Sequence, residues 1–247
     1  MLIFLQKNGI YLTHPMYFFF HLLTGIILGF LISDFLNDRR WLIPCIAGAI
    51  LPDLIDKPVG YIFFPATIGY GRIYTHTLLA AMLVLAIGLA IRKVKNDPGV
   101  MGVGVGILSH QILDLMWQQP PNWYYPLLGP FKGVMTRDYL FILLMRELKN
   151  PFELILAFIL GAGVLAFIFR HKIHAIISRN PPVISMTAAL YALLLCILSG
   201  IIIGRGMARQ SLPEIGWNRP EELIIGGIVI ALSACMVWRW RNSISRE

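Results

Sequence analysis

The sequence predicts an all-α fold, a polytopic membrane helix bundle with about seven transmembrane helices, and two observations lead to that prediction. Hydrophobic residues make up 57% of the chain and charged residues only 14%, whereas soluble domains are about 45–50% apolar and about 25% charged. The apolar residues also gather in runs that approach the roughly 20 residues needed to cross a bilayer. This composition excludes a water-soluble globular enzyme. The net charge of +8 fits basic cytoplasmic loops, so we expect a lipid bilayer and no nucleic acid as partner.

The predicted helices are separated by polar or proline-containing breaks. In chain order they cover residues 15–33, 41–51, 73–91, 99–117, 151–169, 183–204 and 223–238. The second is short, because eleven helical residues rise only about 16 Å, and we expect it to be buried or tilted. Pro98, Pro151 and Pro181 mark three of the breaks. Residues 118–150, rich in proline and aromatic side chains, are typical of a structured loop at the membrane interface.

Lysine and arginine residues predict the orientation, because they concentrate in cytoplasmic loops. If all seven helices cross, one side holds 11 of the 21 lysine and arginine residues within only 36 residues. That side comprises residues 34–40, 92–98, 170–182 and 239–247. We therefore expect a multi-pass protein of the plasma (inner) membrane, with those segments in the cytoplasm.

We expect one integral membrane domain over residues 1–247, in two parts. Residues 14–146 form a core that carries the candidate metal-binding residues, and residues 150–247 add three transmembrane helices to which the sequence assigns no role. Three glutamates of this second part, Glu153, Glu221 and Glu222, are expected to be first-turn charges that the helix dipole favours.

Ionisable residues inside the apolar runs indicate a functional site, because a titratable group at membrane depth is costly. They are His21, Asp53, Asp56, His76, His110 and Asp114. His110 and Asp114 are four residues apart and lie on one helix face. In the seven-helix arrangement all six residues fall at one level near the outer face. Histidine and carboxylate ligands in this number suit Zn²⁺ or a similar divalent ion.

Each of these residues also has a simpler interpretation. A single histidine in an apolar run can be a hydrogen-bonded contact between helices, and His110 with Asp114 can be an internal ion pair. Asp53 and Asp56 can be interfacial caps. Lys57 and Arg72 can be surface charges whose long stems cover apolar surface. Only the joint pattern favours a metal site.

Together these residues resemble the YdjM family of inner-membrane, metal-dependent hydrolases. The family pattern stands here as His21 with Gly25, Leu51-Pro52-Asp53 with Asp56, Thr75-His76-Thr77, and Leu108-Ser109-His110 with Asp114. The resemblance covers residues 14–131. Many members have a histidine at the position of Gly71, and the chain departs from the family there.

The order of these residues is also distantly similar to the zinc-dependent phospholipase C and P1 nuclease superfamily. That similarity implies one metal ion held by Asp53, His76, His110 and Asp114, with His21 assisting a second ion. We expect one or two divalent ions, with Zn²⁺ as the candidate.

The resulting hypothesis is a membrane-embedded hydrolase of a phosphoester or lipid-linked substrate that uses a metal-activated water. Asp56 is the candidate general base, with Arg72 as a catalytic group, and Arg72 and Lys57 are candidates for binding the anionic substrate. The alternatives are a transporter that uses the same residues for ions or protons, and a structural or regulatory membrane protein in which a metal ion only joins the helices.

Overall fold

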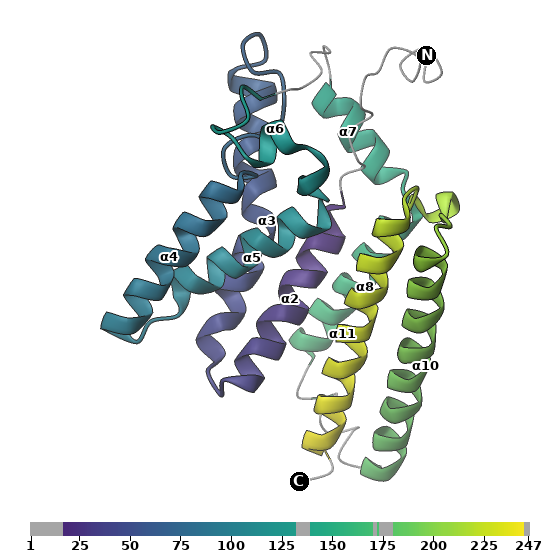
Figure 1. Ribbon diagram of the computed structural model, residues 1–247. Helices are drawn as coiled ribbons and strands as arrows, with labels where there is room; N and C mark the ends of the chain where they lie inside the picture. Colours follow the sequence, from purple (N-terminus) through teal and green to yellow (C-terminus); the bar gives the residue numbers. More distant parts are fainter. Residues whose placement is uncertain (1–16, 132–138, 170–171, 173–179, 245–247) are drawn as a thin grey trace.

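The computed structural model describes residues 17–131, 139–169, 172 and 180–244, and this part of the chain is built from helices (Figure 1). The main helices are α2 (Phe18–Phe35), α3 (Leu42–Pro58), α4 (Leu78–Lys95), α5 (Gly99–Leu113), α6 (Pro120–Trp123), α7 (Tyr139–Leu148), α8 (Pro151–Ile168), α10 (Pro181–Met207) and α11 (Pro220–Ile244). Short helical turns lie at Arg39–Trp41, Val59–Phe63, Met116–Gln118 and Pro213–Ile215. The all-helical prediction is confirmed for the described residues.

Helix α2 lies between two groups of helices (Figure 1). On one side α3 packs against α2 and α5, and α4 packs against α5. On the other side α10 and α11 form a long antiparallel pair, and both α8 and α11 contact α2. The chain therefore consists of an N-terminal half and a C-terminal half that meet along α2.

Within the part of the chain that the structure describes, three helices are long and apolar enough to cross a membrane by length and composition: Phe18–Phe35, Pro181–Met207 and Pro220–Asn242. Two shorter apolar helices cover Gly99–Leu113 and Pro151–Ala166. These helices agree with a membrane protein. The finer prediction, seven crossings, is not decided by these lengths and stays a prediction.

Cap residues and prolines lie at the predicted breaks, where one helix ends and the next begins. Asn96 ends α4 in the left-handed conformation, with φ of 51°, and α5 begins at Gly99 directly after Pro98. Prolines begin α8 and α10, where a missing N–H costs nothing. The side chain of Thr77 caps α4 by accepting a hydrogen bond from the N–H of Ala80 at 3.1 Å.

Several predicted boundaries were wrong. Helix α3 does not end at residue 51 but continues through Pro52 to Pro58, so Asp53 and Asp56 lie inside it. Helix α4 begins at Leu78, which leaves His76 in the loop before it rather than in its first turn. The segment 118–150 contains the helices α6 and α7 as well as loop.

Glycines allow α3 and α5 to approach each other closely. A Cβ atom on Gly48 would lie 2.1 Å from the carbonyl oxygen of Val103, and one on Gly106 would lie 2.4 Å from that of Cys45. Small residues permit such close packing between membrane helices. This contact brings the end of α5, which carries His110, against the middle of α3, which carries Asp53.

Candidate metal centre

All of the sequence-predicted site residues lie together in the interior of the N-terminal half. His21 comes from α2, Asp53 and Asp56 from α3, His76 from the loop before α4, and His110 and Asp114 from the end of α5. These six are buried, with at most 6% of the surface of each exposed, and Lys57 and Arg72 beside them are 8% and 6% exposed. Four separate parts of the chain therefore place histidines and carboxylates around one point, as the sequence predicts.

Asp56 fixes the loop that carries His76. Its carboxylate accepts hydrogen bonds from the backbone N–H groups of Ile73, Thr75 and His76 at 3.0–3.1 Å. It also contacts Nδ1 of the His76 ring at 2.7 Å. A carboxylate accepts, so Nδ1 carries the proton, and Nε2 of His76 presents a lone pair to the centre.

A different partner fixes the orientation and the protonated nitrogen of the His110 ring. Its Nδ1 donates to the carbonyl oxygen of Ala49 at 2.8 Å, which leaves a lone pair on Nε2. The Nε2 atoms of His110 and His76 lie only 3.1 Å apart. With both Nδ1 atoms acting as donors, the two Nε2 lone pairs face each other at this distance, an arrangement that either a shared proton or a bound metal ion stabilises.

Two carboxylate oxygens complete a four-atom cluster with these nitrogens. Oδ1 of Asp53 lies 3.5 Å from Nε2 of His76 and 3.6 Å from Nε2 of His110. Oδ2 of Asp114 lies 3.6 and 3.8 Å from the same two nitrogens. In a tetrahedral zinc site with bonds of about 2.0–2.1 Å, ligand atoms lie about 3.3–3.4 Å apart. Asp53, His76 and His110 form a first group that could hold a divalent ion, and Asp114 borders this group.

Cationic side chains hold the two carboxylates in place. Nζ of Lys57 pairs with Oδ2 of Asp53, and Nε of Arg72 pairs with Oδ2 of Asp114 at 2.7 Å. The other oxygen of Asp53, Oδ1, is buried without a hydrogen-bond partner. A buried carboxylate oxygen is costly to leave unpaired, so this atom is a suitable ligand for a cation.

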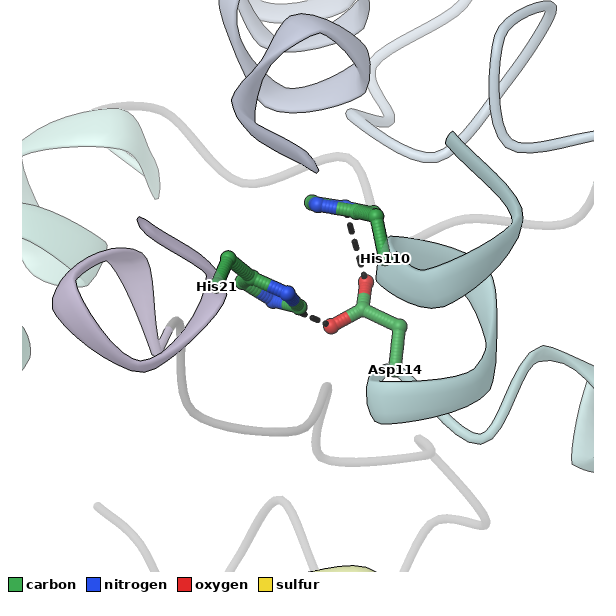
Figure 2. Close-up of side chains that lie close together, drawn as sticks. All are labelled: His21, His110 and Asp114. Carbon is green, nitrogen blue, oxygen red and sulfur yellow. Dashed lines mark ion pairs between the residues drawn. The ribbon is translucent and has the colours of Figure 1, made fainter. Parts of the chain in front are cut away.

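His21 lies beside Asp114, and Figure 2 shows these two residues together with His110. Its Nε2 lies 3.3 Å from Oδ1 of Asp114, and its ring stacks on that of His110 with centroids 3.9 Å apart. His21, His110 and Asp114 form a second possible metal-binding group. His110 has one ring nitrogen to give, so compared with the group of Asp53, His76 and His110 this second group adds only His21 and Asp114.

Three polar side chains that the sequence analysis missed support the site. Gln111 donates to the carbonyl oxygens of Thr75 and Thr77, on either side of His76, at 3.2 and 2.8 Å. The indole of Trp123 donates to Gln111 at 3.0 Å, and Asn122 donates to the carbonyl oxygen of Arg72 at 3.3 Å. The signal for Gln111 was present, since it is a lone amide beside His110 in an apolar helix.

Tyr70 belongs to the same support. It lies in the loop before His76, and its hydroxyl donates to the side chain of Gln119. Burial raises the pKa of Tyr70, so its phenol remains a donor. The loop that carries Arg72 and His76 is thus held from several sides.

The position of Gly71, where the chain departs from the family pattern, is filled by a neighbour. A Cβ atom there would lie 2.5 Å from Cε2 of Tyr61 and 2.9 Å from Cγ of Lys57. The ring of Tyr61 occupies the space that a side chain at position 71 would need. A histidine there would require Tyr61 to move.

Comparison with protein families decides the relationship, since a family described as the YdjM inner membrane protein matches residues 16–239. The chain belongs to the YdjM family. Among curated proteins and among solved structures, no match was found. The YdjM match extends beyond residue 131, where the recognisable motifs end, through nearly all of α11. Both halves are therefore part of the family, and the inner membrane in its description agrees with the candidate spans.

Proposed function

We propose that this protein is a membrane-embedded, metal-dependent hydrolase whose substrate is a phosphoester or a lipid-linked ester. One observation carries the proposal: the lone pairs of His76 Nε2 and His110 Nε2 face each other at 3.1 Å, next to two buried carboxylates. This donor set binds a divalent ion, with Zn²⁺ favoured by two nitrogen and two oxygen ligands. His76, His110, Asp53 and Asp114 would hold it.

A bound divalent ion supplies a water of lowered pKa and polarises a phosphoryl or acyl oxygen. The charges around the site favour an anionic substrate. Three carboxylates, Asp53, Asp56 and Asp114, face two cations, Lys57 and Arg72. The net charge of these five side chains is −1, and a bound divalent ion would change the net charge of the site to +1.

Arg72 is the residue that we propose to bind the anionic group. Its Nε pairs with Asp114, but its Nη1 is buried without a hydrogen-bond partner. A guanidinium with an unused donor beside a metal site suits a phosphate oxygen. The ammonium of Lys57 is already paired with Asp53, so its role in substrate binding stays a prediction.

The contacts of Asp56 favour an orienting role over the predicted role as general base. Both of its oxygens accept hydrogen bonds from the loop, and one also contacts the His76 ring. We propose instead that the proton released by the water passes to the pair of Asp114 and His21, since Nδ1 of His21 has no partner. Binding of a second metal ion by His21 stays a prediction.

Exposed apolar side chains in the segments that follow α3 and α6 agree with a lipid substrate. Phe63 and Phe64 follow α3 shortly after Asp56, and Leu127 and Leu128 follow α6. All four are more than half exposed. In a multi-pass protein with the site near the outer face, as we propose, such side chains would lie among lipid tails and headgroups.

The test is hydrolysis by the purified protein in detergent micelles. We expect the Zn²⁺-loaded protein to cleave a phosphodiester or a phospholipid, and we expect His110→Ala to lose this activity. Arg72→Lys should keep the metal but raise KM for anionic substrates, because lysine retains the charge without the fork of donors. Metal binding without any hydrolysis of phosphoesters or carboxylic esters would contradict the proposal and favour an ion-binding or structural role.

A further inference from the structure

The first turn of α2 is capped by side chains from other helices. A helix begins with four N–H groups that have no partner within it, and the N-cap residue of α2, Tyr17, provides no side-chain cap. Instead, the N–H of Phe18 donates to Glu147 at 2.7 Å, and those of Phe19 and Phe20 donate to Glu153 at 2.7 and 3.3 Å. Two carboxyl groups thus satisfy three consecutive N–H groups.

These two glutamates come from the C-terminal side of the sequence. Glu147 lies near the end of α7 and Glu153 at the start of α8, and they are 7% and 1% exposed. Their carboxyl groups lie close together, because they accept from consecutive N–H groups of one helical turn. Glu153 was expected to serve its own helix, but its oxygens cap α2.

His21 is the next residue after the capped turn. Its N–H makes the first hydrogen bond within α2, to the carbonyl oxygen of Tyr17 at 2.9 Å. The direction of its ring toward Asp114 therefore depends on the turn that Glu147 and Glu153 hold. Fraying of helix ends is common when the cap is lost.

Aromatic packing adds to this connection. The ring of Phe20 contacts those of Phe152 in α8 and Trp217 in the segment before α11, with centroids 5.6 and 6.3 Å apart. The hydroxyl of Tyr17 donates to the carbonyl oxygen of Gly216 at 2.7 Å. The start of α2 is thus held mainly by residues 147–217.

We infer that Glu153 and Glu147 are positioning residues for His21, and that through them the C-terminal half aligns one member of the metal centre. This inference rests on the proposed function in that His21 borders the metal site. It assigns a role to α7 and α8 that does not require either glutamate to touch metal or substrate.

The test is the NMR spectrum of the histidine rings in the full chain, labelled with ¹⁵N-histidine and kept metal-free with a chelator in nanodiscs. The signals of His21, His76 and His110 are assigned by replacing each residue in turn. In Glu153→Ala, which removes two acceptors, we expect the His21 signals to shift or disappear while those of His76 and His110 stay in place. Glu221→Ala, a change at an exposed first-turn glutamate of α11, should move none of them.

A conservative variant separates positioning from general loss of structure. In Glu153→Gln the amide oxygen can still accept from the N–H of Phe19, and the NH₂ group can donate to Glu147, so the His21 signals should return to their native positions. Unmoved His21 signals in Glu153→Ala, or equal shifts of all three histidines, would overturn the inference. This outcome is independent of hydrolysis and of bound metal, so failure of the proposed function would be seen separately.

Discussion

The two halves of the molecule bury different kinds of side chain. The N-terminal half, α2 to α5 with the loop before α4, encloses two aspartates of α3, Asp114, Arg72 and three histidines. In α10 and α11 the buried residues are mostly apolar or small, such as Ala188, Ala192 and Leu223, with Ser199 and Glu222 as polar exceptions. Both halves pack helices through small residues, but among the described residues the cluster of histidines, aspartates and Arg72 lies in the first half, whereas the buried Glu147 and Glu153 of α7 and α8 cap α2. Charged side chains buried in an apolar interior indicate a functional site, because they are too costly to serve helix packing alone.

Removal of divalent ions should have the largest effect, and we expect it in one half only. A ligand present at about 100 times its Kd stabilises a protein by about 2.7 kcal/mol. Chelation should therefore speed amide hydrogen exchange by roughly 100-fold in the loop around His76 and the end of α5. Exchange in α10 and α11 should stay unchanged. If chelation accelerated amide exchange equally in both halves, the metal would not bind specifically in the N-terminal half.

Asp56→Asn should weaken metal binding without removing a ligand. The amide cannot fix the Nδ1 proton of His76 as the carboxylate does, and loss of such a partner costs about 10–100-fold in metal affinity. Competition of the purified protein with a fluorescent zinc chelator measures this change. Asp34→Asn, at an exposed residue that pairs with Arg239, is the matched control, and its affinity should equal that of the native protein.

Replacing one glycine in each half by alanine compares how closely the helices of the two halves pack. Gly106→Ala places a methyl group 2.4 Å from a carbonyl oxygen of α3, and overpacking of this kind costs about 1–3 kcal/mol. Gly200→Ala, in α10, meets no atom within 4 Å and should be neutral or stabilise the helix by up to about 1 kcal/mol. Thermal unfolding in detergent measures both. A destabilised Gly200→Ala beside an unaffected Gly106→Ala would reverse the expected order.

Ser199→Ala should have the smallest effect of the series. Its hydroxyl joins α10 to α11 by donating to the carbonyl oxygen of Gly227 at 2.8 Å. Hydrogen bonds between membrane helices average about 0.6 kcal/mol, so the melting temperature should fall only slightly. Metal content should not change, and any loss of metal would show that the halves are coupled through α10.

Much of the site was predictable because its signals are local in the sequence. The spacing of His110 and Asp114 fixes a shared helix face, and a charge within an apolar run is visible without a structure. The length of α3 was not predictable in this way. Pro52, Asp53 and Asp56 are typical of a helix end, whereas in the protein the helix continues and Asp56 accepts hydrogen bonds from the distant loop at residues 73–76.

The supporting contacts were also beyond prediction from the sequence. Glu153 has the spacing of an ordinary first-turn glutamate, and nothing near it in the sequence indicates that it caps a helix more than a hundred residues earlier. Gln111 joins His76 to Trp123 through tertiary contacts alone. Residue types indicate which groups are costly to bury, but the fold decides which partners stabilise them.

Metal content of the detergent-purified protein, measured by elemental analysis, tests the central claim most directly. We expect about one zinc-like ion per chain in the native protein and in Ser199→Ala, as four ligand atoms around one point predict. His110→Ala and Asp114→Ala should each lose most of it. A native protein that stays metal-free after reconstitution with Zn²⁺ and Mn²⁺, or variants that keep the full metal content, would contradict a metal centre in the N-terminal half.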